Sequence, residues 1–403
     1  MAPDWRASTP PGVPGGAGPS YPVRVNQQPG QPHPQHPQGP PQDPYAPQPP
    51  YGQYAHPAPT GYAPGPYAPP PDAPGPYGPP APVSSVRPDA EFHELTRGPR
   101  RAWWRPVVAL LLWIPVGIVV ALVAIVAMLA PMLSIESQRQ GFEQGGDGMP
   151  EVFHPLTFLG MNAGLAVLVP AAVGVLALAY WMRPGFASSV AGRFRWGWAL
   201  RVLVVLTPWW VLYLLGTAAL AGESFTPHPH RYFWWMLLVV VLTTPLQAAG
   251  EEYLFRGFVM QWFGSWIPWT WLALGLSTVT SVSLFALAHG SLDPWVLADL
   301  GLFALVALVM IVRTGGMEAA VVMHSVNNVT LMVISLFFGG FEDGFVGGDT
   351  TSTPAVLLMS VLLQGVGLAL VEWQWRCSGL GNRTAADPQE LLHPRDRVGA
   401  AAR

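Results

Sequence analysis

Two adjacent carboxylates and an arginine stand where the chain otherwise avoids charge. The segment GEEYLFRG, residues 250–257, follows the apolar run WWMLLVVVLTTPLQAA. Glu252 and Arg256 are four residues apart, so on a helix they share a face and can form an ion pair. Glu251 is turned away from them by about 100° and has no obvious partner. A desolvated carboxylate without a cation beside it can act as a base that takes a proton from water.

Two further apolar stretches are interrupted by polar groups at the same helical spacing. In SLFALAHG, Phe285 and His289 are four residues apart, and in MHSVNNV the same spacing separates His324 from Asn328, with Asn327 between them. Ionisable groups inside membrane spans are costly, and by default they mark functional sites. We therefore expect the three segments to bring these polar side chains to one cavity.

Such a set of side chains can hydrolyse an amide in two ways. In the first, Glu251 takes a proton from water, an imidazole orients that water, and Asn328 with a histidine donates hydrogen bonds to the oxyanion. In the second, Glu251, His289 and His324 bind a catalytic Zn²⁺ that keeps one position open for water. The residue types are compatible with both, and the choice stays open.

Eight apolar stretches are long enough to carry these residues across a bilayer, which takes about 20 residues each. The predicted spans are 104–130, 155–182, 199–221, 233–262, 267–289, 294–312, 316–338 and 354–375. The fold class that follows is all-α, a polytopic membrane helix bundle. On these spans His289 lies near the outer end of its helix, so convergence with Glu251 requires either that this span sits deeper or that its junction with the next span dips inward, which the turn at 291–294 permits.

The composition divides the chain into three parts. Residues 1–98 form a Pro/Gly/Tyr-rich tail, since 30 of the 46 prolines precede residue 101, and such a segment cannot bury enough apolar surface to fold. We expect it to be a disordered cytoplasmic spacer, with docking of a proline-recognising partner as the alternative. The membrane domain spans 99–378, and 379–403 is a short polar tail. The sequence has no stripe of basic residues that would predict nucleic-acid binding.

Charge in the connections predicts the orientation. Arginines cluster before the first span and after the last, whereas the connection after the first span is acidic: Arg97, Arg100, Arg101, Arg105; Arg376, Arg383, Arg395, Arg397; Glu136, Glu143, Asp147, Glu151. By the positive-inside rule both termini are cytoplasmic. We expect a multi-pass protein of the cell (plasma) membrane, with the lipid bilayer as its surroundings.

The three motifs together resemble those of the CPBP family, the CAAX-processing and bacteriocin-processing (Abi-type) intramembrane proteases. Residues 251–257, EEYLFRG, resemble the family's EExxxR motif; FALAH, 285–289, resembles FxxxH; and HSVNN, 324–328, resembles HxxxN/D. They occur in family order, and the resemblance covers about 190–338.

This resemblance implies a role for each matching residue. It implies Glu251 as the base that activates water, His289 as the group that positions the water, and His324 with Asn328 as stabilisers of the oxyanion. Glu252, Arg256 and Phe285 are implied as supporting residues. The family is often described as metalloproteases, but a metal-free glutamate mechanism is also argued for it. The implied substrate is a peptide or a membrane-anchored protein.

Two readings from other classes stay open. The first is a non-enzymatic membrane adaptor or bacteriocin self-immunity protein on the same fold, in which the proline-rich tail recruits partners. The second is a small transporter that uses Glu251 as a proton relay, although the sequence shows no inverted repeat of the kind common in transporters. The occupied motif positions favour the enzyme.

Overall fold

The computed structural model describes residues 84–99, 101–135, 154–222, 225–341 and 344–392. The predicted tail up to residue 83 lies outside these ranges, as does the acidic connection with Glu136, Glu143, Asp147 and Glu151. The described residues form helices and two isolated β-bridges, without strands. The helices are α1 (Arg105–Ser134), α3 (Pro155–Ala166), α4 (Leu168–Tyr180), α5 (Trp196–Leu220), α6 (Phe233–Glu252), α7 (Val259–Trp266), α8 (Thr270–Ala288), α9 (Pro294–Thr314), α10 (Glu318–Phe338) and α11 (Pro354–Arg376).

Eight stretches of helix in the described part of the chain are long and apolar enough to cross a membrane, as predicted. They are Arg105–Ala127, Pro155–Tyr180, Trp196–Leu220, Phe233–Trp266, Thr270–Ala288, Pro294–Thr314, Glu318–Phe338 and Pro354–Arg376. Most of the exposed large side chains on these helices are apolar, which is what lipid contact requires. The all-α, multi-pass membrane architecture is therefore confirmed.

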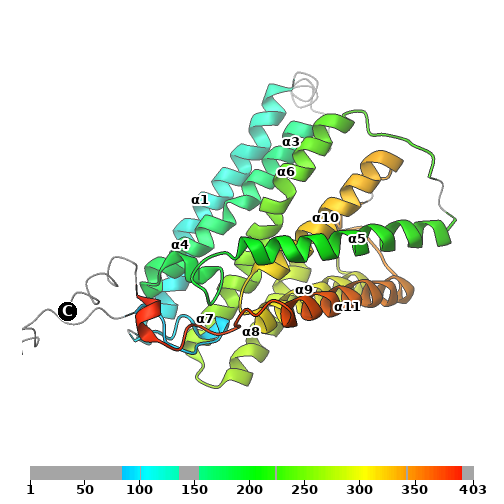
Figure 1. The fold of residues 1–403 in the computed structure, drawn as a ribbon. Helices are drawn as coiled ribbons and strands as arrows, with labels where there is room; N and C mark the ends of the chain where they lie inside the picture. The colour runs from blue at the N-terminus through cyan, green and yellow to red at the C-terminus, as the bar shows by residue number, and fades with distance from the viewer. Residues whose placement is uncertain (1–83, 100, 136–153, 223–224, 342–343, 393–403) are drawn as a thin grey trace, which may run out of the picture. The chain divides into compact units, whose positions relative to one another are not determined.

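Helix α10, which carries His324 and Asn328, lies at the centre of the bundle. It packs against α6, α5 and α9. Figure 1 shows α1, α3 and α6 side by side on one flank and α5, α9 and α11 on the other, with α10 between them. Residues 319–326 of α10 are all buried. Polar side chains there must find their partners within the protein.

The EEYLFRG motif changes the helix type in the middle of its span. Residues Tyr253–Phe258 form a π-helix between α6 and α7, so the backbone hydrogen bonds loosen by one residue directly after Glu252. Short π-helical segments inside α-helices occur frequently at functional sites. The sequence pattern did not predict this change.

Two segments that were assigned to the tails pack on the membrane domain. Residues 84–99 contain the short helix η1 (Phe92–Glu94), and the side chains of Phe92 and Leu95 are buried. This segment pairs with the C-terminal part through hydrogen bonds between Ala90 and Thr384. Among the described residues, 84–98 and 379–392 therefore pack on the membrane domain, because a few apolar side chains anchor otherwise polar flanks.

Candidate active site

A buried ion pair stands at the base of the site. Glu252 and Arg256 are both 0% exposed, and Arg256 Nη1 lies 3.0 Å from Glu252 Oε1, so the predicted pair is present. The guanidinium also lies over the ring of Phe285, 3.9 Å from its centroid. A cation is best buried where a carboxylate and an aromatic face both compensate it. Phe285 of α8 thus joins the second motif to the first.

The same carboxylate orients His324. Glu252 Oε1 lies 2.9 Å from His324 Nδ1. Since Glu252 is paired with Arg256, we treat it as a carboxylate that only accepts, and the imidazole therefore donates from Nδ1. Phe303 and Phe285 pack edge-on against the ring, with centroid distances of 5.1 and 5.9 Å. The imidazole is fixed on three sides, and its Nε2 atom lies 3.8 Å from Glu251 Oε2.

Glu251 is the acidic group that this arrangement leaves available. Its Oε1 accepts a hydrogen bond from Gln247, one turn earlier on α6. Its Oε2 is buried and has no hydrogen-bond partner in the described part of the chain, and it lies 3.8 Å from His324 Nε2. That separation is too long for a direct hydrogen bond and short enough for a shared water. The two adjacent glutamates thus have different surroundings: Glu252 is in an ion pair with Arg256, and Glu251 Oε2 has no hydrogen-bond partner among the described residues.

His289 stands beside the site without touching Glu251. It is the C-terminal cap of α8, its Nδ1 lies 2.8 Å from the Phe285 carbonyl oxygen, and its ring packs on that of Phe285, 4.7 Å away. In the turn that follows, Ser291 is 0% exposed and donates to the Thr350 carbonyl, whereas Leu292 is 78% exposed. The inward dip of this turn therefore stays a prediction.

Asn328 lies one turn beyond His324 on α10. Its Oδ1 accepts from Asn327 Nδ2 at 3.2 Å, and its own Nδ2 has no partner among the described residues. Asn327 is held from the other side, because its Oδ1 accepts from Trp210 Nε1 of α5 at 3.1 Å. Asn327 therefore has a packing role, and Asn328 keeps a free N–H donor.

The proposed zinc ligands do not assemble in this structure. Among the described residues no three His, Cys, Asp or Glu side chains gather closely enough to hold a metal ion. His324 has Nδ1 committed to Glu252, and His289 has Nδ1 committed to the Phe285 backbone. The zinc alternative stays a prediction.

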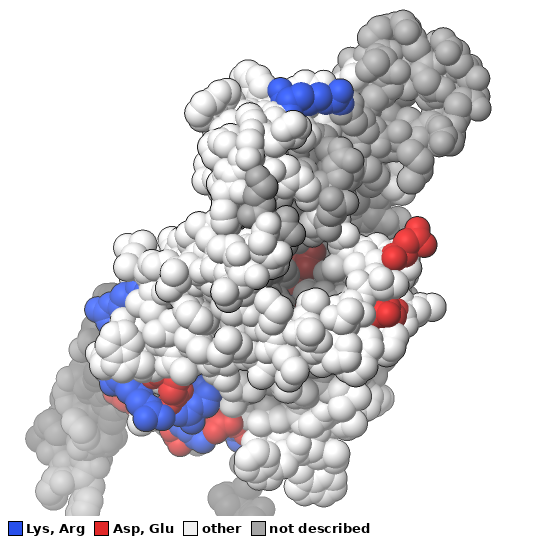
Figure 2. Space-filling view, turned by 90° about the vertical axis from the view of Figure 1, so that its right-hand side faces the viewer, with Lys and Arg blue, Asp and Glu red and all other residues white. Residues whose placement is uncertain are grey.

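The two adjacent glutamates differ in exposure. The Glu251 side chain is 12% exposed, whereas that of Glu252 is 0% exposed. Figure 2 shows acidic atoms in a hollow near the middle of one face, with other charged side chains at the top, the right and the lower left of that face. A carboxylate at partial exposure can exchange protons with water and still be shielded from the bulk.

Sequence reasoning missed two groups of residues around the site. His324 and Glu252 are 72 residues apart in sequence, so helical spacing could not pair them. Glu318, at the start of α10, is 0% exposed and binds Arg195, which is 123 residues away in sequence. The available signal for Glu318 was an acidic residue within the largely apolar run RTGGMEAAVVMH.

The family comparison agrees with the motifs. Residues 230–330 match the family model described as Rce1-like, type II CAAX prenyl endopeptidase. This range contains the EEYLFRG, FALAH and HSVNN segments and covers about a quarter of the chain. No curated protein and no solved structure matches. The resemblance to the CAAX-processing protease family is thereby confirmed, and the chain is similar to type II CAAX prenyl endopeptidases over the residues that carry its motifs.

Proposed function

We propose that this protein is an intramembrane endopeptidase that hydrolyses a peptide bond with water activated by Glu251. The observation that carries the proposal is the free, buried Oε2 atom of Glu251, 3.8 Å from Nε2 of an oriented His324. A base next to a second proton-carrying group is what acyl transfer to water requires. The family match over the same residues supports this reaction class.

The reaction begins with a water molecule bound between Glu251 and His324. Glu251 takes one proton as the water oxygen bonds to the carbonyl carbon of the substrate, which becomes a tetrahedral oxyanion. The N–H of Asn328 is free to stabilise that oxyanion, and His289, whose ring packs against Phe285, is the group proposed to position the water. Collapse of the intermediate breaks the C–N bond, and the stored proton passes to the leaving nitrogen.

His324 has a defined part in this proton transfer. Its Nδ1–H is committed to Glu252, so Nε2 can donate to an oxyanion only when the imidazole carries a second proton. Glu251 Oε2 lies 3.8 Å from Nε2, so the proton taken from water can reside on His324 while the tetrahedral intermediate lasts, and the same proton then passes to the leaving nitrogen. Glu252 and Arg256 contribute by holding the ring in place, and neither contacts the substrate.

The substrate class that fits is a peptide or a membrane-anchored protein whose scissile bond reaches the hollow. The site lies on membrane-crossing helices, so the substrate must enter from the bilayer or from its surface. We place the protein in the cell membrane with both termini in the cytoplasm, on the arginine distribution described above.

A peptide library incubated in H₂¹⁸O with the purified, detergent-solubilised protein tests the proposal. Hydrolysis creates new C-termini, each of which gains one ¹⁸O that mass spectrometry detects. A parallel sample with a chelator, together with metal analysis, separates the metal-free route from the zinc route. If a library that includes membrane-anchored substrates in nanodiscs yields no new termini, the peptidase assignment is wrong and the adaptor reading takes its place.

A further inference from the structure

One connecting segment holds both halves of the candidate site. Residues 184–195 lie between α4 and α5 and begin with the short helix η2 (Pro184–Ala187). They contact the start of α10, which carries His324, and the π-helix that follows Glu252. Both contacts are built from buried hydrogen bonds. The contact with the start of α10 involves no residue of the three motifs.

The contact with α10 is a buried, bidentate ion pair. Arg195 donates from Nε and Nη2 to Glu318, at 2.8 and 2.7 Å, and its backbone N–H donates to the same carboxylate at 2.8 Å. Glu318 is 0% exposed, and Arg195 is 7% exposed. Two parallel hydrogen bonds between a guanidinium and a carboxylate fix orientation as well as distance. The first residue of α10 is therefore fixed in position and in rotation.

The backbone around this pair leaves little room for adjustment. Val190 N–H donates to the Gly315 carbonyl at 2.9 Å, and Met317 N–H donates to the Ser188 carbonyl at 2.8 Å. A Cβ atom on Gly316 would lie only 2.4 Å from both Arg195 Nη2 and Glu318 Oε2. A residue other than glycine at 316 would have to displace the pair.

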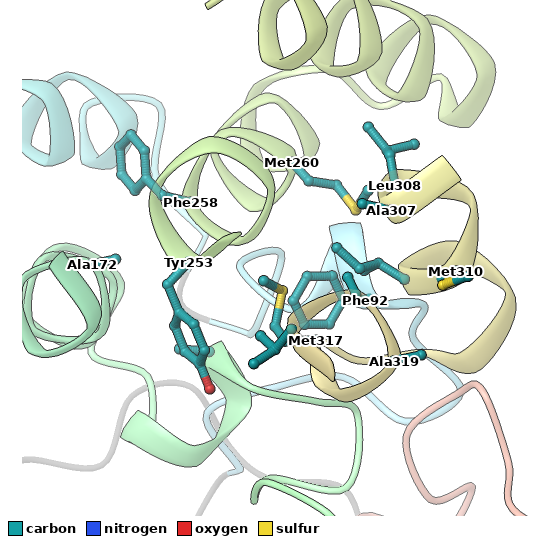
Figure 3. Close-up of a cluster of buried hydrophobic side chains, with 14 of the residues drawn as sticks. Phe92, Ala172, Tyr253, Phe258, Met260, Ala307, Leu308, Met310, Met317 and Ala319 are labelled. Atoms are coloured by element: carbon teal, nitrogen blue, oxygen red, sulfur yellow. The ribbon is translucent and has the colours of Figure 1, made fainter. Parts of the chain in front are cut away.

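The contact with the π-helix is a single hydroxyl pair. Ser188 Oγ and the Tyr253 hydroxyl oxygen are 2.6 Å apart, and the Tyr253 side chain is 5% exposed. Tyr253 directly follows Glu252 in the motif. Figure 3 shows Tyr253 and Met317 in one cluster of buried side chains, so the start of α10 and the π-helix meet on this segment.

We propose that residues 184–195 act as a brace that sets the position of His324 relative to Glu251 and Glu252. The positioning residues are Ser188 and Arg195 in the brace, Tyr253 on the π-helix and Glu318 on α10. Because a helix is stiff, fixing residue 318 fixes His324 six residues later, about 9 Å along the axis. The brace contacts no reacting group directly, and its effect on catalysis rests on the proposed function.

Removal of one hydroxyl tests the brace without breaking a buried charge pair. In Tyr253→Phe we expect kcat, counted per folded molecule, to fall about 10- to 100-fold with little change in KM, because small misplacements of reacting groups cost this much. Tyr213→Phe is the matched control, since Tyr213 donates its hydroxyl proton to the Met359 carbonyl at 2.6 Å, between α5 and α11. Equal kcat values in both variants would overturn the proposal.

A second measurement is independent of catalysis. The single cysteine, Cys377, is replaced by serine, and nitroxide labels are attached through new cysteines at the exposed Leu246 of α6 and Leu331 of α10. We expect Arg195→Gln or Tyr253→Phe to shift or broaden the dipolar EPR distance distribution. An unchanged distribution refutes the brace even if the parent cleaves no peptide, whereas failure of cleavage with the expected EPR change refutes only the peptidase.

Discussion

Substitution by glutamine should lower the free energy of unfolding strongly at Glu252 and only slightly at Glu251. Glu252 is 0% exposed and compensates Arg256, which is also 0% exposed, besides accepting from His324 at 2.9 Å. In Glu252→Gln the guanidinium remains buried without a counter-charge, and loss of one partner of a buried pair costs about 3–5 kcal/mol. We expect a loss of that size in the free energy of unfolding.

In Glu251→Gln the expected loss is small. Glu251 has no arginine partner within ion-pair distance among the described residues, and its best contact is the hydrogen bond from Gln247. A neutral amide keeps an oxygen that can accept this bond, so the change in the free energy of unfolding should stay within about 1 kcal/mol. Activity should nevertheless be lost, because an amide is not a base.

Equilibrium unfolding of each variant in mixed detergent–SDS micelles, followed by tryptophan fluorescence, measures both values. A double variant, Glu252→Gln with Arg256→Met, serves as the control, because removing both charges should restore much of the stability that the single change loses. Equal destabilisation by the two glutamine substitutions, or a larger effect at Glu251, would refute the assignment of the paired and the free carboxylate.

Three further expectations concern residues around the site. Asn328→Ala should lower kcat about 10²–10³-fold with little change in thermal stability. Asn327→Ala removes the acceptor for a buried indole and should mainly lower stability. Measuring both kcat and the melting temperature of each variant separates the two effects. Gly250→Ala should cost about 1–3 kcal/mol, because its Cβ would lie 2.1 Å from a backbone oxygen of α3, while Gly216→Ala, with open space around it, should be neutral or stabilising in the same unfolding assay. Burial lowers the pKa of His93 to about 4, so between pH 6.5 and 4 the imidazole is protonated when the segment is undocked and neutral when it is docked. The docking of 84–99 should therefore weaken by up to about 3 kcal/mol as the pH falls through that range. Limited proteolysis at several pH values measures this, and His93→Gln should remove the pH dependence.

The architecture followed from local pattern because each span is a separate apolar run. A stretch of about 20 apolar residues predicts a helix without reference to any other part of the chain. The Glu252–Arg256 pair was predictable for the same reason, since both residues lie on one helical turn. Predictions of this kind need only the 3.6-residue period.

Contacts between distant segments were beyond such a pattern. The bond from His324 to Glu252 joins α10 to α6, and the pair of Arg195 and Glu318 joins residues 123 positions apart. Neither spacing has a period that helix geometry could exploit. The π-helix at 253–258 was missed because an apolar run predicts a helix but not its hydrogen-bond type, and the packing of 84–99 was missed because a few buried side chains outweighed a tail-like composition.

The central claim is that Glu251 activates the water that cleaves the substrate. Its most direct test compares cleavage of one peptide, chosen from the library, by the parent, by Glu251→Gln and by Glu372→Gln at equal folded concentration. Glu372 is a matched control because, among the described residues, its carboxylate pairs only with the exposed Arg313 and Arg376 at the ends of α9 and α11. We predict that the parent and Glu372→Gln cleave at similar rates and that Glu251→Gln is inactive. Cleavage by Glu251→Gln at the parental rate would contradict the account.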